Sequence, residues 1–143
     1  MKKMNNKGFS LVELIIVIAI MAILIAVLAP QYIKYVEKSR RSADLDNYQA
    51  IINAVQTAFA DEDYNDSLSG VTTFTITTAK GSSVNCANSS VNAVMKDLGV
   101  DLSNIKTKSS LYGTATLNVS LTSGIVKITT TNSSLAKELG LSL

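Results

Sequence analysis

Apolar residues form one unbroken segment near the N-terminus of the chain. Phe9 to Ala29 contains 21 residues, and only Ser10 and Glu13 among them are polar. A helix of this length would measure about 31 Å, which is enough to cross the hydrocarbon core of a bilayer. Because such a helix is apolar on every side, lipid or other apolar helices must surround it.

After Pro30 the apolar residues recur at steps of three and four, which predicts an amphipathic helix that ends near Ala60. A proline inside a helix removes one backbone hydrogen bond and kinks the axis, but apolar surroundings can hold the helix together. We therefore expect one bent helix from Phe9 to Ala60, about 78 Å long. Its second half presents an apolar stripe of Tyr48, Ile51, Ile52, Val55, Ala58 and Phe59.

The segment from Ser67 to Ser134 contains 31 Ser, Thr and Asn residues among its 68. Low-complexity disorder is one interpretation of that composition, but apolar residues at regular positions indicate a folded region rich in strands. Strands are predicted at Val71–Thr78, Thr114–Leu121 and Ile125–Thr131. The intervening Thr122-Ser123-Gly124 predicts a hairpin turn between the last two strands.

Two short helical segments complete the predicted head. Ser90 is the predicted N-cap of the first, which Gly99 ends, and Ser134 to Leu139 form the second. An antiparallel sheet laid over the apolar stripe of the long helix gives the α+β class. The predicted architecture is a long N-terminal helix, with an apolar transmembrane half and an amphipathic half, packed on a small antiparallel β-sheet head.

Residue types that support catalysis are scarce. The chain has no His and a single Cys, Cys86. A histidine general base, a Cys–His nucleophile pair, a Cys-based zinc cluster and an internal disulfide are therefore excluded. No convergent catalytic set remains, so we expect no enzyme, no cofactor and no bound metal. We interpret Cys86 as a loop residue or a buried thiol.

One acidic segment resembles a calcium loop in part. Asp61, Asp63 and Asn65 stand at the first, third and fifth positions of an EF-hand loop. Asp66 stands where that loop needs Gly, however, and Thr72 stands where it needs the final Glu. A solvated loop is the favoured interpretation of residues 61–66, and calcium binding is the alternative.

The net charge of +2 gives no reason to expect nucleic acid as a partner. Lys2, Lys3 and Lys7 lie ahead of the apolar segment, and without them 10 basic and 11 acidic residues would remain. From Val71 to Leu143, six lysines stand against three carboxylates. This excess is too slight and too scattered to predict a nucleic-acid surface.

A basic N-terminus followed by an apolar segment also fits a secretory signal peptide. The segment is longer than the usual apolar region of about 7–15 residues, and it carries Glu13 near its start. Cleavage after Ala29 would leave Pro30 as the first residue, which should obstruct a conventional signal peptidase. A cleaved signal and an uncut anchor remain as alternatives.

The sequence Lys7-Gly8-Phe9-Ser10-Leu11-Val12-Glu13-Leu14 resembles the processing and assembly motif of type IV pilins and pseudopilins. In that family a short basic leader ends in Gly, Phe follows, and Glu stands four residues later. An unbroken apolar segment comes next, with a proline near its end. The resemblance implies a cleaved leader at residues 1–8, a transmembrane and filament-core helix at 9–30, its amphipathic half at 31–60 and a β-rich head at 61–143.

The resemblance also implies how the chain is handled in the cell. A prepilin peptidase would cut between Gly8 and Phe9, and the new amine of Phe9 would be methylated. The inner membrane would hold the subunit, with its helix kinked at Pro30. An assembly ATPase and an inner-membrane platform would then add it to other pilin subunits in an extracellular pilus for adhesion, motility or biofilm. A pseudopilin of a secretion or DNA-uptake system is the alternative.

The single cysteine refines the resemblance. Many Gram-negative pilins close their C-terminal region with a disulfide, which this chain cannot form because Cys86 has no partner. The chain therefore looks more like the Gram-positive, clostridial-type pilins.

Glu13 is a candidate functional residue because a carboxylate in an apolar helix is costly unless it is paired or protonated. It could sit solvated at the membrane interface, near the positive end of the helix. After cleavage, the ammonium of Phe9 would lie one helical turn away and could pair with Glu13 in the same chain. The resemblance implies instead that Glu13 meets the amine of a neighbouring subunit and sets the axial register of the filament.

Overall fold

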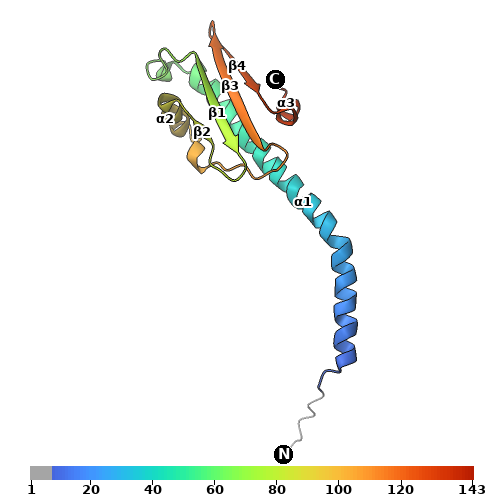
Figure 1. Ribbon diagram of the computed structural model, residues 1–143. Helices are drawn as coiled ribbons and strands as arrows, with labels where there is room; N and C mark the ends of the chain where they lie inside the picture. Colours follow the sequence, from blue (N-terminus) through green and yellow to red (C-terminus); the bar gives the residue numbers. More distant parts are fainter. Residues whose placement is uncertain (1–7) are drawn as a thin grey trace, which may run out of the picture. The chain divides into compact units, whose positions relative to one another are not determined.

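The computed structural model describes residues 8–143, so Lys2, Lys3 and Lys7 lie outside the described residues. The longest element is helix α1, Leu11–Ala60, which continues through Pro30 (Figure 1). The chain divides into two compact units inside this helix. The first unit ends at Val36, and the second comprises Glu37–Leu143.

The first unit contains the N-terminal part of α1, and every side chain from Gly8 to Tyr35 is exposed. The predicted helix start at Phe9 was wrong by two residues, since α1 begins at Leu11. The reason is local, because Ser10 occupies the cap position ahead of the first turn. Its carbonyl accepts a hydrogen bond from the Leu14 N–H over 3.2 Å.

In the second unit, the C-terminal part of α1 packs on a four-stranded antiparallel sheet with the order β2-β1-β3-β4 (Figure 1). The strands are β1 Thr73–Ala79, β2 Asn85–Cys86, β3 Thr114–Thr122 and β4 Ile125–Thr130. The shorter helices are η1 Glu62–Tyr64, α2 Ser89–Asp97, η2 Leu102–Asn104 and α3 Ser133–Leu139. This arrangement confirms the α+β class, the long N-terminal helix and the small antiparallel sheet.

Alternation along the strands explains how the sheet covers α1. In β1, Phe74, Ile76 and Thr78 are buried, whereas the threonines between them are exposed. The predicted stripe of α1 faces this sheet, and all of its members are buried except Phe59, which is partly buried. The ring of Phe59 stacks on that of Phe74, with 5.9 Å between the centroids. One apolar core therefore joins α1 to the sheet.

The element ends differ from the prediction where another side chain provides the cap. The predicted cap at Ser90 was wrong, because Asn88 Oδ1 accepts the Val91 N–H over 3.1 Å and Ser90 lies inside α2. Asn132 caps α3 in the same way, so α3 begins at Ser133, one residue earlier than predicted.

The observed strand ends also differ from the predicted ones by one or two residues. Strand β1 begins at Thr73 instead of Val71, and β4 ends at Thr130 instead of Thr131. Strand β2 was not predicted, since two residues are too few to show a periodic pattern.

Candidate functional site

The bond between Gly8 and Phe9 lies in exposed chain ahead of the first helix. Gly8, Phe9 and Ser10 have no regular secondary structure, and Phe9 is 84% exposed. A Cβ built on Gly8 would meet no atom within 4 Å. Among the described residues, this bond is exposed and lies outside α1.

Glu13 caps its own helix in this structure. Its Oε2 accepts a hydrogen bond from the Ser10 N–H over 2.9 Å, which satisfies a backbone donor that the helix itself cannot pair. This is one half of a capping box, in which the third residue of a helix reaches back to the cap residue. The capping box was not predicted above, although the Ser10-x-x-Glu13 spacing is its sequence signature.

The apolar half of α1 presents a continuous apolar surface. Within the described residues, α1 is the one helix long and apolar enough to cross a membrane, judged by length and composition. Its most apolar window has a mean hydropathy of 3.3, and no part of that window is buried. Pro30 lies near the end of this surface without ending the helix. The expected kink at Pro30 stays a prediction.

Two carboxylates on α1 hold the segment that connects η2 to β3. Asp44, only 1% exposed, accepts the Lys108 N–H at 2.9 Å and the Ser109 N–H at 2.7 Å. Glu37, two turns earlier, accepts the Ser109 hydroxyl at 2.7 Å and the Ser110 N–H at 2.6 Å. We call these two residues the carboxylate clamp. It fixes the 108–110 segment through its backbone, which no apolar contact could do.

Other polar groups of the same helix tie α1 to α3 and β1. Arg41 pairs with Glu138 of α3, and the Tyr112 hydroxyl donates to the same carboxylate. The Tyr48 hydroxyl lies 2.6 Å from the Thr78 hydroxyl, and its ring meets the Tyr112 ring edge-on. Burial raises the pKa of both tyrosines, so their hydroxyls stay protonated and keep these hydrogen bonds at neutral pH.

We expect the stabilisation by Glu37 to disappear in acid. Hydrogen bonds from the Ser109 and Ser110 hydroxyls and from the Ser110 N–H lower the pKa of Glu37 from 4.5 to about 2. The folded state thus binds this proton less tightly than the unfolded state, so acid favours unfolding. The contribution is complete above pH 4.5 and is lost as the pH falls to about 2.

Thermal unfolding of the full chain in detergent micelles checks this expectation. Wild type should melt above Glu37→Gln at about pH 6, and the difference should close near pH 2. An equal difference at both pH values would contradict the assigned role.

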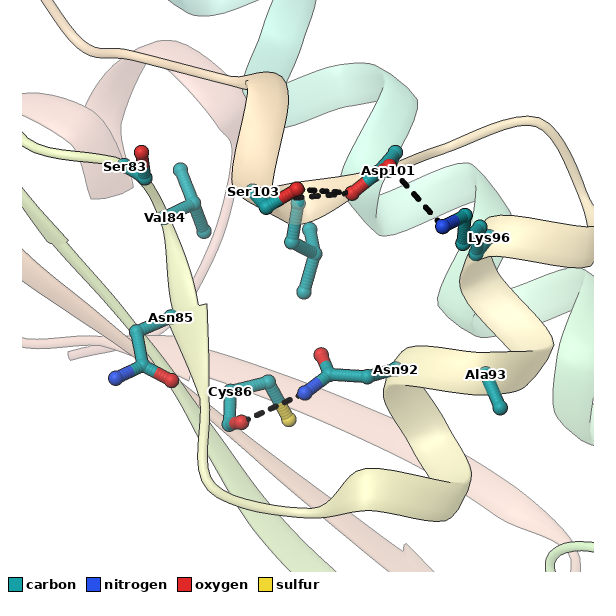
Figure 2. A pocket seen from close by; sticks show the side chains of 10 residues that line it. Ser83, Val84, Asn85, Cys86, Asn92, Ala93, Lys96, Asp101 and Ser103 are labelled. Atoms are coloured by element: carbon teal, nitrogen blue, oxygen red, sulfur yellow. Dashed lines mark hydrogen bonds and ion pairs between the residues drawn. The ribbon is translucent and has the colours of Figure 1, made fainter.

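A groove of about 490 Å³ lies between β2, α2 and η2 (Figure 2). Asp101 accepts the Ser103 hydroxyl over 2.6 Å, which lowers the pKa of Asp101, and it pairs with Lys96 at 3.7 Å. Asn92 Nδ2 donates to the Cys86 carbonyl over 2.9 Å. These contacts pair several of the groove's polar groups with one another, whereas the buried Asn92 Oδ1 has no hydrogen-bond partner among the described residues.

Cys86 is the buried thiol that one of our two interpretations expected, and it lies on β2. Its Sγ is 3.8 Å from the Asn88 carbonyl, and burial raises the pKa of the thiol. Because the thiolate is the reactive form, a raised pKa makes this cysteine a poor nucleophile.

The acidic segment after α1 forms η1. Asp61 caps it by accepting the Asp63 N–H over 3.0 Å. In the described part of the chain, no three Asp, Glu or Cys side chains gather closely enough to hold a metal ion. The carboxylate of Asp61 is thus used in a cap, and the solvated-loop interpretation of residues 61–66 stays a prediction.

Comparison with known proteins supports the resemblance. Residues 3–29 match the family model of the prokaryotic N-terminal methylation motif. The type IV major pilin protein PilA of Myxococcus xanthus is 40% identical over 63 residues, which are 43% of this chain and 29% of that protein. The type IV major fimbrial protein FimA of Dichelobacter nodosus is 36% identical over 80 residues, 55% of this chain and 51% of that protein.

A further relative is the prepilin peptidase-dependent protein A of Clostridium perfringens, 36% identical over 80 residues, 55% of each chain. The chain thus spans between 29% and 55% of the length of these relatives. No solved structure gives a significant match. These matches confirm that the chain resembles the type IV pilins. The narrower clostridial assignment stays a prediction, since relatives from other bacteria match equally well.

Proposed function

We propose that this chain is a structural subunit of a type IV pilus. The observation that carries the proposal is the combination of the N-terminal methylation motif with a 50-residue helix whose apolar half is wholly exposed. Such a surface has to be covered by lipid before assembly and by equivalent helices afterwards. The pilin names of the relatives support the same function.

In this proposal a prepilin peptidase removes residues 1–8 by cutting between Gly8 and Phe9, and the Phe9 amine is methylated. Residues 9–30 then anchor the subunit in the membrane and later form the filament core, with a kink at Pro30. Residues 31–60 carry the head, residues 61–143. Glu13 pairs with the Phe9 amine of a neighbouring subunit during assembly.

The proposed partners are other pilin subunits, the prepilin peptidase, an assembly ATPase and its inner-membrane platform. The subunit is a single-pass membrane protein before assembly and lies on the cell surface afterwards. Its role is mechanical and not catalytic, because polymerisation draws its energy from the ATPase.

Deleting the gene and restoring it tests the proposed function. Electron microscopy should show long surface fibres that disappear on deletion, return on complementation and bind an antibody against the head. Fibres that persist in the deletion strain would contradict the proposal. A deletion that abolishes secretion or DNA uptake in cells without long fibres would favour a pseudopilin instead.

A further inference from the structure

The second unit carries opposite charges at its two ends. At the end where α1 enters the unit, exposed lysines project from two adjoining loops: Lys80, Lys106 and Lys108. A hydrogen bond of 2.8 Å from the Gly81 N–H to the Thr107 carbonyl and a bridge between Ser83 and Lys106 hold these loops together. Among residues 8–143, none of the three lysines forms an ion pair. We call this surface the basic end.

Hydrogen bonds to α1 and β1 hold the backbone of the basic end in place. Asp44 binds the N–H of Lys108, and the Thr107 hydroxyl donates to the Ala79 carbonyl over 3.1 Å. Thr107 is buried, so Lys106 and Lys108 on either side of it project toward solvent. The lysines therefore stand on a rigid support, which lowers the entropic cost of binding a partner there.

Carboxylates collect at the opposite end of the unit, where α1 stops. These residues are Asp61, Glu62, Asp63, Asp66 and Asp97. The Tyr64 hydroxyl donates to Asp97 over 2.8 Å and thereby joins η1 to the end of α2. This hydrogen bond, with the charges of Asp97, Asp61 and Asp63, raises the pKa of Tyr64. Within the described residues, none of the five carboxylates has a Lys or Arg partner. We call this surface the acidic end.

The two ends cannot neutralise each other within one chain. Asp44 touches the basic end, and Ala60 directly precedes the acidic end. The helix between these two residues is about 24 Å long, far beyond the reach of an ion pair. Each end is therefore exposed and available to an oppositely charged surface of another molecule.

We infer that the basic end of one copy docks on the acidic end of a second copy, so that heads join end to end. An interface between two different surfaces of the same chain is heterologous, and such interfaces build open helical filaments when the rotation between successive copies does not close a ring. A lipid or nucleic-acid partner would use the basic end alone and leave five carboxylates unmatched. The inference rests on the proposed function, because it describes one contact within the proposed pilus.

Chemical cross-linking of assembled fibres tests the contact directly. A carbodiimide joins a lysine to a carboxylate only when the two touch. We expect mass spectrometry to find Lys106 or Lys108 linked to a carboxylate of the 61–66 segment, a link that must connect two copies. Fibres that yield other lysine–carboxylate links but not this one would overturn the inference.

A charge swap supplies the second test. The double variant Lys106→Glu with Lys108→Glu should lower fibre yield by about tenfold. One exposed ion pair raises the affinity between two subunits by about fivefold or less, but several such pairs form at every contact. Adding Glu62→Lys and Asp63→Lys to the same subunit should restore the fibres. Lys127→Glu, on the outer face of the sheet, is the matched control and should leave the yield unchanged.

Each outcome of the swap has a distinct meaning. Unchanged yield in the lysine variant, or a loss that the swap does not repair while all variants melt like wild type, would overturn the inference. If wild type itself forms no fibres, the proposed function has failed instead.

Discussion

Glu13→Gln is expected to abolish surface fibres while the precursor stays in the membrane with its helix capped. The amide oxygen of Gln can still accept the Ser10 N–H that Glu13 accepts here, so the capping contact survives. What disappears is the charge. If Glu13 pairs with the Phe9 ammonium of a neighbour, that ammonium is left unpaired in an apolar core, at a cost of about 3–5 kcal/mol for each subunit contact. Because about 1.4 kcal/mol corresponds to a tenfold change in affinity, filament growth should fail.

Two further variants separate capping from pairing. Glu13→Ala removes the cap and the charge together, makes the segment more apolar and should leave membrane insertion intact. Ser10→Ala keeps the backbone N–H that Glu13 binds and should still form fibres. Electron microscopy and immunoblots of membrane fractions provide the measurements. Normal fibres built only from Glu13→Gln subunits would limit Glu13 to the cap that the structure shows.

Asp44→Ala is expected to destabilise the head by about 2–6 kcal/mol, since each of two backbone donors left without its acceptor costs about 1–3 kcal/mol. The substitution leaves the N–H groups of Lys108 and Ser109 without the acceptor that now holds them. Urea unfolding of the full chain in detergent micelles, followed by tyrosine fluorescence, measures the loss. Tyr48 and Tyr112 are buried beside the clamp and report on this region.

Asp46 offers the matched control, because it is an exposed carboxylate two residues after Asp44 in the same helix. Asp46→Ala should change stability by less than about 0.5 kcal/mol. Equal effects of the Asp44 and Asp46 substitutions would contradict the role given to the carboxylate clamp.

Local patterns predicted most of the fold, and the reason is visible in particular residues. The apolar stripe from Tyr48 to Phe59 and the alternation of Phe74 and Ile76 with threonines both follow from the geometry of single elements. Helix caps were harder to predict, since Asn88 and Ser90 are both residue types that favour the N-cap position. Only the backbone at Asn88 takes the extended conformation that a cap requires.

The carboxylate clamp could not be predicted in this way. In the sequence Glu37 and Asp44 look like ordinary polar residues of an amphipathic helix. Their partners, Ser109 and Lys108, stand 72 and 64 positions further along the chain. A single sequence contains no local signal for such contacts. The opposed charges of the basic and acidic ends were missed for the same reason, because the loops that carry Lys80 and Lys106 meet only in the folded head.

The proposed processing segment, residues 7–14, could in contrast be predicted from the sequence. The spacing of Gly8, Phe9 and Glu13 predicts the processing and assembly residues of the proposed pilin, because the pattern lies within six consecutive residues. The structure adds two facts: the peptide bond between Gly8 and Phe9 is exposed, and the Ser10 N–H donates a hydrogen bond to the Glu13 carboxylate. The second of these was present in the sequence as a capping-box signature.

We propose that this chain is cut after Gly8 and built into a surface filament. Mass spectrometry of the protein recovered from sheared surface fibres tests that claim most directly. We predict an N-terminal peptide that begins at Phe9 and carries a methyl group on its amine. A mature N-terminus at Pro30, or an intact Met1 in assembled material, would contradict it.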